Sequence, residues 1–202
     1  MIAAGLVALG YVLGSLPWGL WLPRLVAGVD VRTLGSGNIG ATNVWRALGF
    51  KLGLSVALLD IAKGAAAALV ARWLAGDLVA VLAGLAALAG HWRPLFLTFA
   101  RGGKVVATTG GVGLALAFFA TLSASGVWIA VFLATRYASV ASIGAAATLP
   151  LFALLFGASV PILVFTVAAA LAVAVLHRTN VRRLRAGTEN RFRLRRRAVA
   201  GA

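Results

Sequence analysis

A stretch of small and polar residues at 35–43 has the residue types that bind anions. It reads GSGNIGATN, and Arg46 follows it closely. Gly35 and Gly37 let backbone N–H groups approach a ligand closely. Polar side chains add further donors, which are Ser36, Asn38, Thr42 and Asn43. With the planar guanidinium of Arg46 the stretch suits phosphate, and a flexible polar turn that caps a helix is the alternative that composition leaves open.

A second cationic stretch, at 90–109, reads GHWRPLFLTFARGGKVVATT and ends where a new apolar helix is expected. Gly102, Gly103 and Lys104 would combine backbone N–H groups, a helix N-terminus and an ammonium group in one place. Thr108 adds a hydroxyl one turn further on. The stretch predicts a second anion site, and its two arginines have a simpler interpretation as charges that face lipid headgroups. The first stretch, 35–43, matches neither a P-loop nor a dinucleotide-binding fingerprint, which argues against a nucleotide site.

A third set of polar residues follows the last apolar segment. His177 and Asn180 are spaced i, i+3 and would share one face of a helix. Histidine is the usual general base near neutral pH, whereas a hydrogen-bonded histidine at the membrane interface is the simpler interpretation. Glu189 is the one acid among many arginines, and we expect an internal salt bridge there that positions the tail.

Two smaller groups of polar residues lie nearer to the apolar segments. Ser142 follows Arg136 at a short turn, and such a serine often bonds only its own helix backbone. Asp60 and Lys63 are spaced i, i+3 inside an apolar segment and can pair. A charge pair within a membrane is a functional candidate by default, although we favour a mostly structural role for this one.

The composition shows where these residues must sit. The chain has 202 residues, of which 62% are hydrophobic and 11% charged, and its mean hydropathy is +1.00. Soluble domains have about 45–50% apolar and about 25% charged residues, so we expect an all-α integral membrane protein of one domain. The net charge of +15 would suggest nucleic acid in a soluble protein, but not in a chain this apolar. Cysteine is absent and the few acids and histidines form no ligand cluster, so we expect no metal or cofactor.

The apolar segments predict seven transmembrane helices, with five as the fallback. The expected spans are 2–22, 53–72, 78–97, 107–122, 126–137, 141–157 and 160–177. With the N-terminus outside and the C-terminus cytoplasmic, 17 of the 19 basic residues fall on the inner side, as the positive-inside rule requires. The single domain 1–202 then ends in a basic cytoplasmic tail, 178–202. All the polar stretches converge on the cytoplasmic face.

Four motifs carry a resemblance to a known family. They are GSGNIGATN at 35–43, GHWRPLFLTFARGGKVVAT at 90–108, TRYASVASI at 135–143 and HRTNVRRLRAGTEN at 177–190. In this order they resemble the bacterial acyl-phosphate:glycerol-3-phosphate acyltransferases, the PlsY family, and they run across nearly the whole chain. The family's second motif usually continues Gly-Gly-Lys-Gly, whereas Val105 stands in the last place here. The departure leaves Lys104 in place and bears on the backbone geometry that follows it.

The resemblance implies a reaction and a place for it. A fatty acyl group would pass from acyl phosphate to the 1-hydroxyl of glycerol 3-phosphate, which gives lysophosphatidic acid and phosphate and opens bacterial phospholipid synthesis. Neither acyl-CoA nor a metal would be needed. The protein would be a multi-pass protein of the bacterial inner membrane, in contact with membrane lipid, with its site facing the cytoplasm and a functional link to the soluble enzyme that makes acyl phosphate.

The resemblance also implies roles for site residues. The expected polar site is Ser36, Arg46, Lys104, Ser142, His177 and Asn180. Lys104 and Arg46 would bind phosphate, Ser36 would donate to the acyl donor, and His177 with Asn180 would orient or deprotonate the acceptor hydroxyl. The departing phosphate could instead take that proton. An acyl phosphate is already activated, so positioning and charge stabilisation suffice and no enzyme nucleophile is required.

Two other classes of protein share part of this pattern. A small transporter of an organic phosphate would use the same cationic loops, but it should show polar groups deep in several spans or an internal repeat. A membrane scaffold that grips anionic lipid with its tail would leave both glycine-rich stretches unexplained. The acyltransferase accounts for the pattern best.

Overall fold

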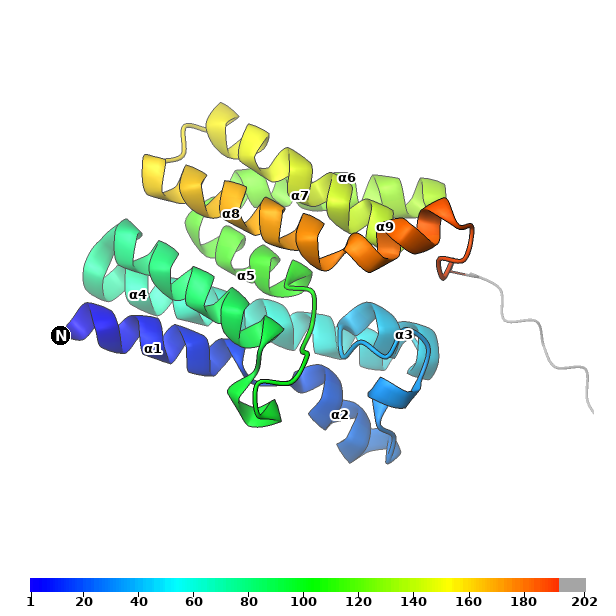
Figure 1. Cartoon of the computed structure of the whole chain (residues 1–202). Helices are drawn as coiled ribbons and strands as arrows, with labels where there is room; N and C mark the ends of the chain where they lie inside the picture. The colour runs from blue at the N-terminus through cyan, green and yellow to red at the C-terminus, as the bar shows by residue number, and fades with distance from the viewer. Residues whose placement is uncertain (193–202) are drawn as a thin grey trace, which may run out of the picture.

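A computed structural model of the chain describes residues 1–192, and every regular element in that range is a helix (Figure 1). The α-helices are α1 Ile2–Gly14, α2 Trp18–Ala27, α3 Ala41–Leu48, α4 Phe50–Trp92, α5 Val106–Leu116, α6 Phe118–Thr135, α7 Ala138–Leu155, α8 Val160–Leu176 and α9 Arg178–Arg185. Short 3-10 turns occupy Val31–Thr33 and Leu95–Leu97. The four basic residues after residue 192 that were assigned to the tail lie outside the described residues.

Helix α4 is a hairpin of two arms that reverses at Gly76. This residue has φ 77° and ψ −178°, which is not helical. Nζ of Lys63 lies 2.8 Å from Nδ1 of His91, whereas 28 residues of straight helix would separate them by about 42 Å. The two arms match the spans expected at 53–72 and 78–97, except that the second arm ends at Trp92.

The first expected span, 2–22, is interrupted. Helix α1 ends at Gly14 and α2 begins at Trp18, because Pro17 lacks the N–H that a continuous helix would need. At the interruption the carbonyl of Leu16 accepts from the backbone N–H of Trp18 at 3.1 Å and from the ammonium of Lys63 at 2.8 Å. A break in one helix therefore supplies a polar partner for a buried charge in another.

The boundary expected between 107–122 and 126–137 is wrong. The chain turns at Ala117 (φ −142°, ψ 65°), and α6 runs without a break through the predicted turn. Ser123 and Ser125 suggested that turn, but each hydroxyl donates to the carbonyl four residues earlier, at 2.9 and 2.8 Å. Because their polarity is satisfied within the helix, these serines did not mark a loop.

The helices have the length and composition of a membrane protein. Among the described residues, four helical segments are long and apolar enough to cross a bilayer, or five when α8 and α9, which meet at a bend of 50°, count as one broken span. Large apolar side chains remain exposed on their surfaces, such as Trp73, Leu151 and Leu171. A soluble protein rarely exposes so many, so lipid is the expected neighbour.

Small residues bring the helices close together. A Cβ at Gly10 would lie 2.4 Å from the carbonyl oxygen of Ala83, and one at Gly14 would lie 2.1 Å from that of Ala87. Only glycine permits this approach between α1 and the second arm of α4, which is typical of helix packing in membranes. The register, 10 with 83 and 14 with 87, also shows that the two helices run parallel.

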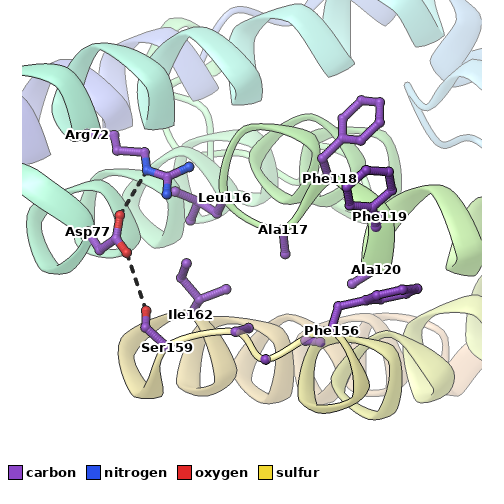
Figure 2. Close-up of a pocket in the computed structure, with 13 residues that line it drawn as sticks. Arg72, Asp77, Leu116, Ala117, Phe118, Phe119, Ala120, Phe156, Ser159 and Ile162 are labelled. Carbon is purple, nitrogen blue, oxygen red and sulfur yellow. Dashed lines mark hydrogen bonds and ion pairs between the residues drawn. The ribbon is translucent and has the colours of Figure 1, made fainter.

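The two ends of the bundle differ. The turn at Gly76 and the α7–α8 turn lie near the N-terminal end, whereas α3 and α9 lie at the other end (Figure 1). A cavity of about 380 Å³ opens at the first end beside an ion pair, where Nε of Arg72 lies 2.9 Å from Asp77 and Ser159 donates to the same carboxylate at 3.3 Å (Figure 2). These contacts join the two arms of α4 to the start of α8.

Candidate active site

A larger cavity, of about 690 Å³, lies at the opposite end and has a polar and an apolar part. The polar part gathers side chains from all four motifs, which include Ser36, Arg46, Lys104, Ser142, His177, Asn180 and Glu189. The apolar part is formed mainly by α4, α6 and α7, with Leu54, Ala57, Ile61, Ala124, Ile129, Leu133, Ala145 and Leu149. A cavity of this form suits a molecule with an anionic head and an apolar chain.

The buried amide of Asn43 shapes the loop at 35–43 from within. Its Nδ2 donates to the carbonyls of Leu34 at 3.0 Å and Asn38 at 2.9 Å. Its Oδ1 accepts the backbone N–H of Ser36 at 3.0 Å. A Cβ at Gly35, which has φ 56°, would lie 2.5 Å from the same oxygen, so the loop requires glycine there. Asn43 thereby fixes the backbone that presents Ser36 to the cavity.

Asn38 joins the first motif to the second. Its Oδ1 accepts the backbone N–H of Gly40 at 2.8 Å, and its Nδ2 donates to the carbonyl of Gly102 at 3.2 Å. Residues 64 positions apart are thus held together by one amide, and the loops that carry Ser36 and Lys104 become parts of one structure.

A series of hydrogen bonds joins Lys104 to Glu189. Its ammonium donates to Oδ1 of Asn180, whose Nδ2 donates to Oε1 of Glu189 at 2.6 Å. The same carboxylate accepts from Ser139 at 2.8 Å and from Nε of Arg183 at 2.7 Å. Glu189 therefore forms an internal salt bridge with Arg183 and joins α7, α9 and the Lys104 loop.

These contacts change the acid–base properties of two groups outside the spans. Burial, with the positive charge of Arg183 as the next cause, lowers the pKa of Lys104 to about 8 despite the opposite effect of Glu189. Burial alone would raise the pKa of Glu189, but hydrogen bonds from Asn180, Arg183 and Ser139 outweigh it and hold that pKa below its usual value. Glu189 is thus ionised, while Lys104 is a cation that titrates near physiological pH.

Arg46 lacks a partner for a buried donor. Its guanidinium lies 4.6 Å from the ring centroid of Phe192, and NH2 makes only a long contact of 3.5 Å with the carbonyl of Asn190. Nε is buried and has no hydrogen-bond partner within residues 1–192. Buried donors in native proteins are almost always paired, so the cavity is arranged for an acceptor that a ligand would supply.

His177 and Ser142 complete the polar part. The imidazole is 4% exposed, and Nδ1 lies 2.8 Å from the carbonyl of Val173. Since a carbonyl can only accept, the proton belongs on Nδ1, and Nε2 is left as an acceptor. Ser142 donates to the carbonyl of Ala138 at 2.7 Å and accepts from the indole of Trp128 at 3.1 Å.

The candidate residues divide into two groups. Ten of them line the cavity, namely Ser36, Asn38, Thr42, Asn43, Arg46, Lys104, Ser142, His177, Asn180 and Glu189. The remaining five do not line it, namely Gly35, Gly37, Gly102, Gly103 and Thr108. The four glycines belong to the loops behind the lining, and the fully buried Thr108 packs against Gly64 between α5 and α4.

Several lining residues were not among the candidates. Ser139, Arg183 and His91 all border the cavity. Spacing carried a signal for two of them, because Ser139 precedes Ser142 by three residues and Arg183 follows Asn180 by three. His91 gave no such signal, since its partner Lys63 lies 28 residues away. Within residues 1–192 no group of three acidic, histidine or cysteine side chains is placed to hold a metal ion.

The balance of charge in the polar part favours an anion. Arg183 is paired with Glu189, which leaves Arg46 and Lys104 without a carboxylate partner among the described lining residues. Two uncompensated cations beside an apolar chamber match a phosphate that carries an acyl chain.

The sequence matches the family described as "Glycerol-3-phosphate acyltransferase" over residues 4–187. The chain belongs to this family. Curated glycerol-3-phosphate acyltransferases from Geobacter sulfurreducens and Desulforudis audaxviator are 47% and 45% identical to it over 189 residues. The alignments cover 93% and 94% of this chain and 96% and 95% of the respective relatives.

The glycerol-3-phosphate acyltransferase fold is also seen in solved relatives. The crystal structure of PlsY (YgiH), an integral membrane glycerol 3-phosphate acyltransferase, in its glycerol 3-phosphate form is 42% identical, with a TM-score of 0.91 and coverage of 96% of both chains. Its lysophosphatidic acid form is 41% identical, with a TM-score of 0.89 and the same coverage. The present chain is therefore an all-helical integral membrane protein of the same fold.

Proposed function

We propose that the large cavity is the site at which this acyltransferase moves a fatty acyl group from acyl phosphate to the 1-hydroxyl of glycerol 3-phosphate. The products are lysophosphatidic acid and phosphate, and the step opens phospholipid synthesis. Membership of the family supports the activity. The observation that carries the assignment is the pair of uncompensated cations, Arg46 and Lys104, at the polar end of an otherwise apolar cavity. The matches to acyltransferases do not favour the transporter alternative.

In this proposal the two cations hold the phosphates. Arg46 offers its unpaired Nε and the other N–H donors of its guanidinium group. Lys104 offers a compact ammonium charge that Asn180 orients. The hydroxyl of Ser36, which lines the cavity, donates to the acyl donor. Ser142 and Thr42 line the same cavity. The acyl chain occupies the chamber between α4, α6 and α7, where it is shielded from water.

The reaction needs correct placement of an activated acyl donor and an acceptor hydroxyl. The hydroxyl oxygen attacks the acyl carbonyl carbon, the bond from that carbon to the phosphate oxygen breaks, and the phosphate departs with the hydroxyl proton. In the bound substrate Nε2 of His177 accepts a hydrogen bond from the hydroxyl and so directs the oxygen toward the carbonyl. As the new C–O bond forms, the proton passes from this hydrogen bond to the departing phosphate. Because the mixed anhydride is already activated, positioning and charge stabilisation by Lys104 and Arg46 supply the catalysis.

The remaining candidates support the loops. Asn38 and Asn43 use their amides to hold the first motif in shape, and the left-handed glycines Gly35 and Gly37 let it turn. Gly102 and Gly103 bring the second motif against α4, and Thr108 packs the start of α5. Glu189 fixes Arg183 and Asn180, so that its effect on substrate is indirect.

We further propose seven membrane crossings with the N-terminus outside. They are α1, the two arms of α4, α5, α6, α7 and α8. The parallel packing of α1 with the second arm of α4 supports this order. In this orientation the protein lies in the bacterial inner membrane and its cavity faces the cytoplasm. A soluble enzyme would supply acyl phosphate from that side.

A cysteine-free chain allows a clean test of this topology. Single cysteines at Ile2, Ser159 and Ala186, which are all exposed, would be treated with a membrane-impermeant maleimide in intact cells. We expect labelling at Ile2→Cys and Ser159→Cys, and labelling of Ala186→Cys only after permeabilisation. External labelling of Ala186→Cys would contradict the orientation.

The activity itself is tested by incubating the purified protein with acyl phosphate and glycerol 3-phosphate and measuring lysophosphatidic acid. We expect product with the wild type and strong losses with Lys104→Ala and His177→Ala. Arg72→Gln is the matched control, since it removes a cation at the far end of the bundle. No product with the wild type would refute the function, and unchanged turnover in both site variants would refute the site.

A further inference from the structure

A buried network of three ionisable side chains lies beside the site. Nζ of Lys63 lies 2.8 Å from Oδ1 of Asp60, 2.8 Å from Nδ1 of His91 and 2.8 Å from the carbonyl oxygen of Leu16. The three side chains are no more than about 5% exposed, with Asp60 at 2%, Lys63 at 4% and His91 at 5%. The ammonium therefore has two hydrogen-bond partners, Nδ1 of His91 and the carbonyl of Leu16, and forms an ion pair with Asp60.

This arrangement determines where the proton of His91 lies. A lysine ammonium can only donate, so Nδ1 of His91 must accept from Lys63. The neutral ring then carries its proton on Nε2. Within residues 1–192 the polar contacts of the ring are both at Nδ1, to Lys63 and to Asp60 at 3.6 Å.

The Nε2–H edge lies at the second motif. The backbone N–H of Gly103 donates to the carbonyl of His91 at 3.0 Å, and a Cβ at Gly103 would lie 2.0 Å from Nε2. The ring edge at Nε2 packs against the backbone of Gly103, beside Lys104, and Nε2 has no hydrogen-bond partner within residues 1–192. His91 is also part of the lining of the large cavity.

We propose that His91 is an additional substrate-binding residue, which donates Nε2–H to a phosphate oxygen in the cavity, and that Asp60 and Lys63 are positioning residues that hold the ring in this tautomer. The inference rests on the proposed function, because the acceptor is the phosphate of acyl phosphate or of glycerol 3-phosphate. The anion site would then consist of two cations, Arg46 and Lys104, and one neutral donor, His91. It also gives the buried Asp60–Lys63 pair a purpose beyond packing.

The proposal is tested with two variants of His91, each of which replaces one of the two ring nitrogens with an amide group. His91→Gln places an amide N–H near the position of Nε2, whereas His91→Asn keeps an acceptor for Lys63 near the position of Nδ1 and offers no donor toward the cavity. We expect His91→Asn to raise the KM of one phosphate substrate about tenfold or more with a small change in kcat, since hydrogen bonds to charged groups are worth about 1.5–3 kcal/mol. We expect His91→Gln to stay within about threefold of wild type.

The kinetics separate the possible results. The substrate whose KM rises in His91→Asn is the one whose phosphate His91 contacts. If both KM values stay at the wild-type level in a folded His91→Asn protein, the proposal is wrong. If His91→Gln and His91→Asn lose kcat equally with no change in either KM, the role is structural and the proposal is wrong as well. A wild type that makes no lysophosphatidic acid would instead refute the proposed function.

Nitrogen NMR gives a readout that does not depend on turnover. The chain has two histidines, and the structure places them in opposite tautomers, with the proton on Nε2 in His91 and on Nδ1 in His177. Ring-¹⁵N-labelled wild-type protein should show one ring of each kind, and His91→Asn should remove the Nε2–H ring. Addition of glycerol 3-phosphate or of a non-hydrolysable acyl phosphonate should shift the Nε2 resonance. Two rings protonated at Nδ1, or an Nε2 resonance that neither ligand moves, would overturn the proposal.

Discussion

The side-chain amide of Asn180 donates a 2.6 Å hydrogen bond to Oε1 of Glu189, while its oxygen accepts from the ammonium of Lys104. One amide thus stands between a cation and a carboxylate and satisfies both. The arrangement holds the end of the described chain against the Lys104 loop. It also explains why one acid occurs in a segment that is otherwise basic, because Glu189 accepts from Asn180, Ser139 and Arg183 together.

Exchange of the amide and the carboxylate tests this relationship. Asn180→Asp would place two carboxylates in contact, and we expect a loss of about 1–3 kcal/mol, seen as a lower melting temperature in detergent. Adding Glu189→Gln restores a donor and an acceptor in reversed order, so the double variant should melt above Asn180→Asp alone. A double variant that melts as low as the sum of the two single losses would show that the contact is not the cause.

The pH profile should report Lys104. With its pKa lowered to about 8, chiefly by burial, Lys104 is protonated below that pH and loses its charge above it. Since phosphate binding requires the charged form, kcat/KM should fall as the pH rises through 8, by about tenfold at pH 9. In Lys104→Arg the guanidinium stays charged, and the fall should disappear from this range even if the overall rate is lower. An unchanged fall in Lys104→Arg would assign the titration to another group.

Variants of His177 distinguish orientation from proton removal. His177→Ala should lower kcat about 100-fold, because no group then directs the hydroxyl. His177→Gln keeps a hydrogen-bonding side chain that cannot act as a base, and we expect it to retain activity within about tenfold of wild type. A His177→Gln enzyme as slow as His177→Ala would show that the imidazole must take the proton.

Val105 holds an unusual backbone conformation that a stability comparison can detect. It has φ 58°, in the left-handed region, and is 1% exposed within the core that α4 and α5 share. Both Val105→Ala and Val105→Gly lose the buried methyl groups, but only glycine removes the left-handed strain, of about 1–2 kcal/mol. Val105→Gly should therefore melt above Val105→Ala, which is the reverse of the usual order. A lower melting temperature for Val105→Gly would contradict this conformation.

Control variants should leave the site intact. Arg72 and Asp77 pair at the far end of the bundle, with side chains 44% and 34% exposed. Exposed pairs contribute about 0–1 kcal/mol. Arg72→Gln should therefore change KM and kcat little, and a large loss of activity there would indicate that the two ends of the bundle are coupled.

The sequence was most informative where chemistry needs particular residues. The glycines beside Arg46 and Lys104, and the spacing of His177 and Asn180, pointed to polar residues of the cavity lining without coordinates. Helix ends were harder to predict, because hydropathy does not register a break such as Ala117 when the flanking helices are apolar all round. The spans expected at 53–72 and 78–97 implied the reversal of α4, but contacts between the two arms carried no local signal, so the pairing of Lys63 with His91 came only from the structure.

The most direct test of the central claim is the stoichiometry of the reaction. Purified protein in lipid nanodiscs would receive acyl phosphate and labelled glycerol 3-phosphate, and lysophosphatidic acid and free phosphate would be measured together. The account predicts equal amounts of the two products, with no requirement for an added metal and no product when acyl-CoA replaces acyl phosphate. Phosphate release without lysophosphatidic acid, or equal turnover with acyl-CoA, would contradict it.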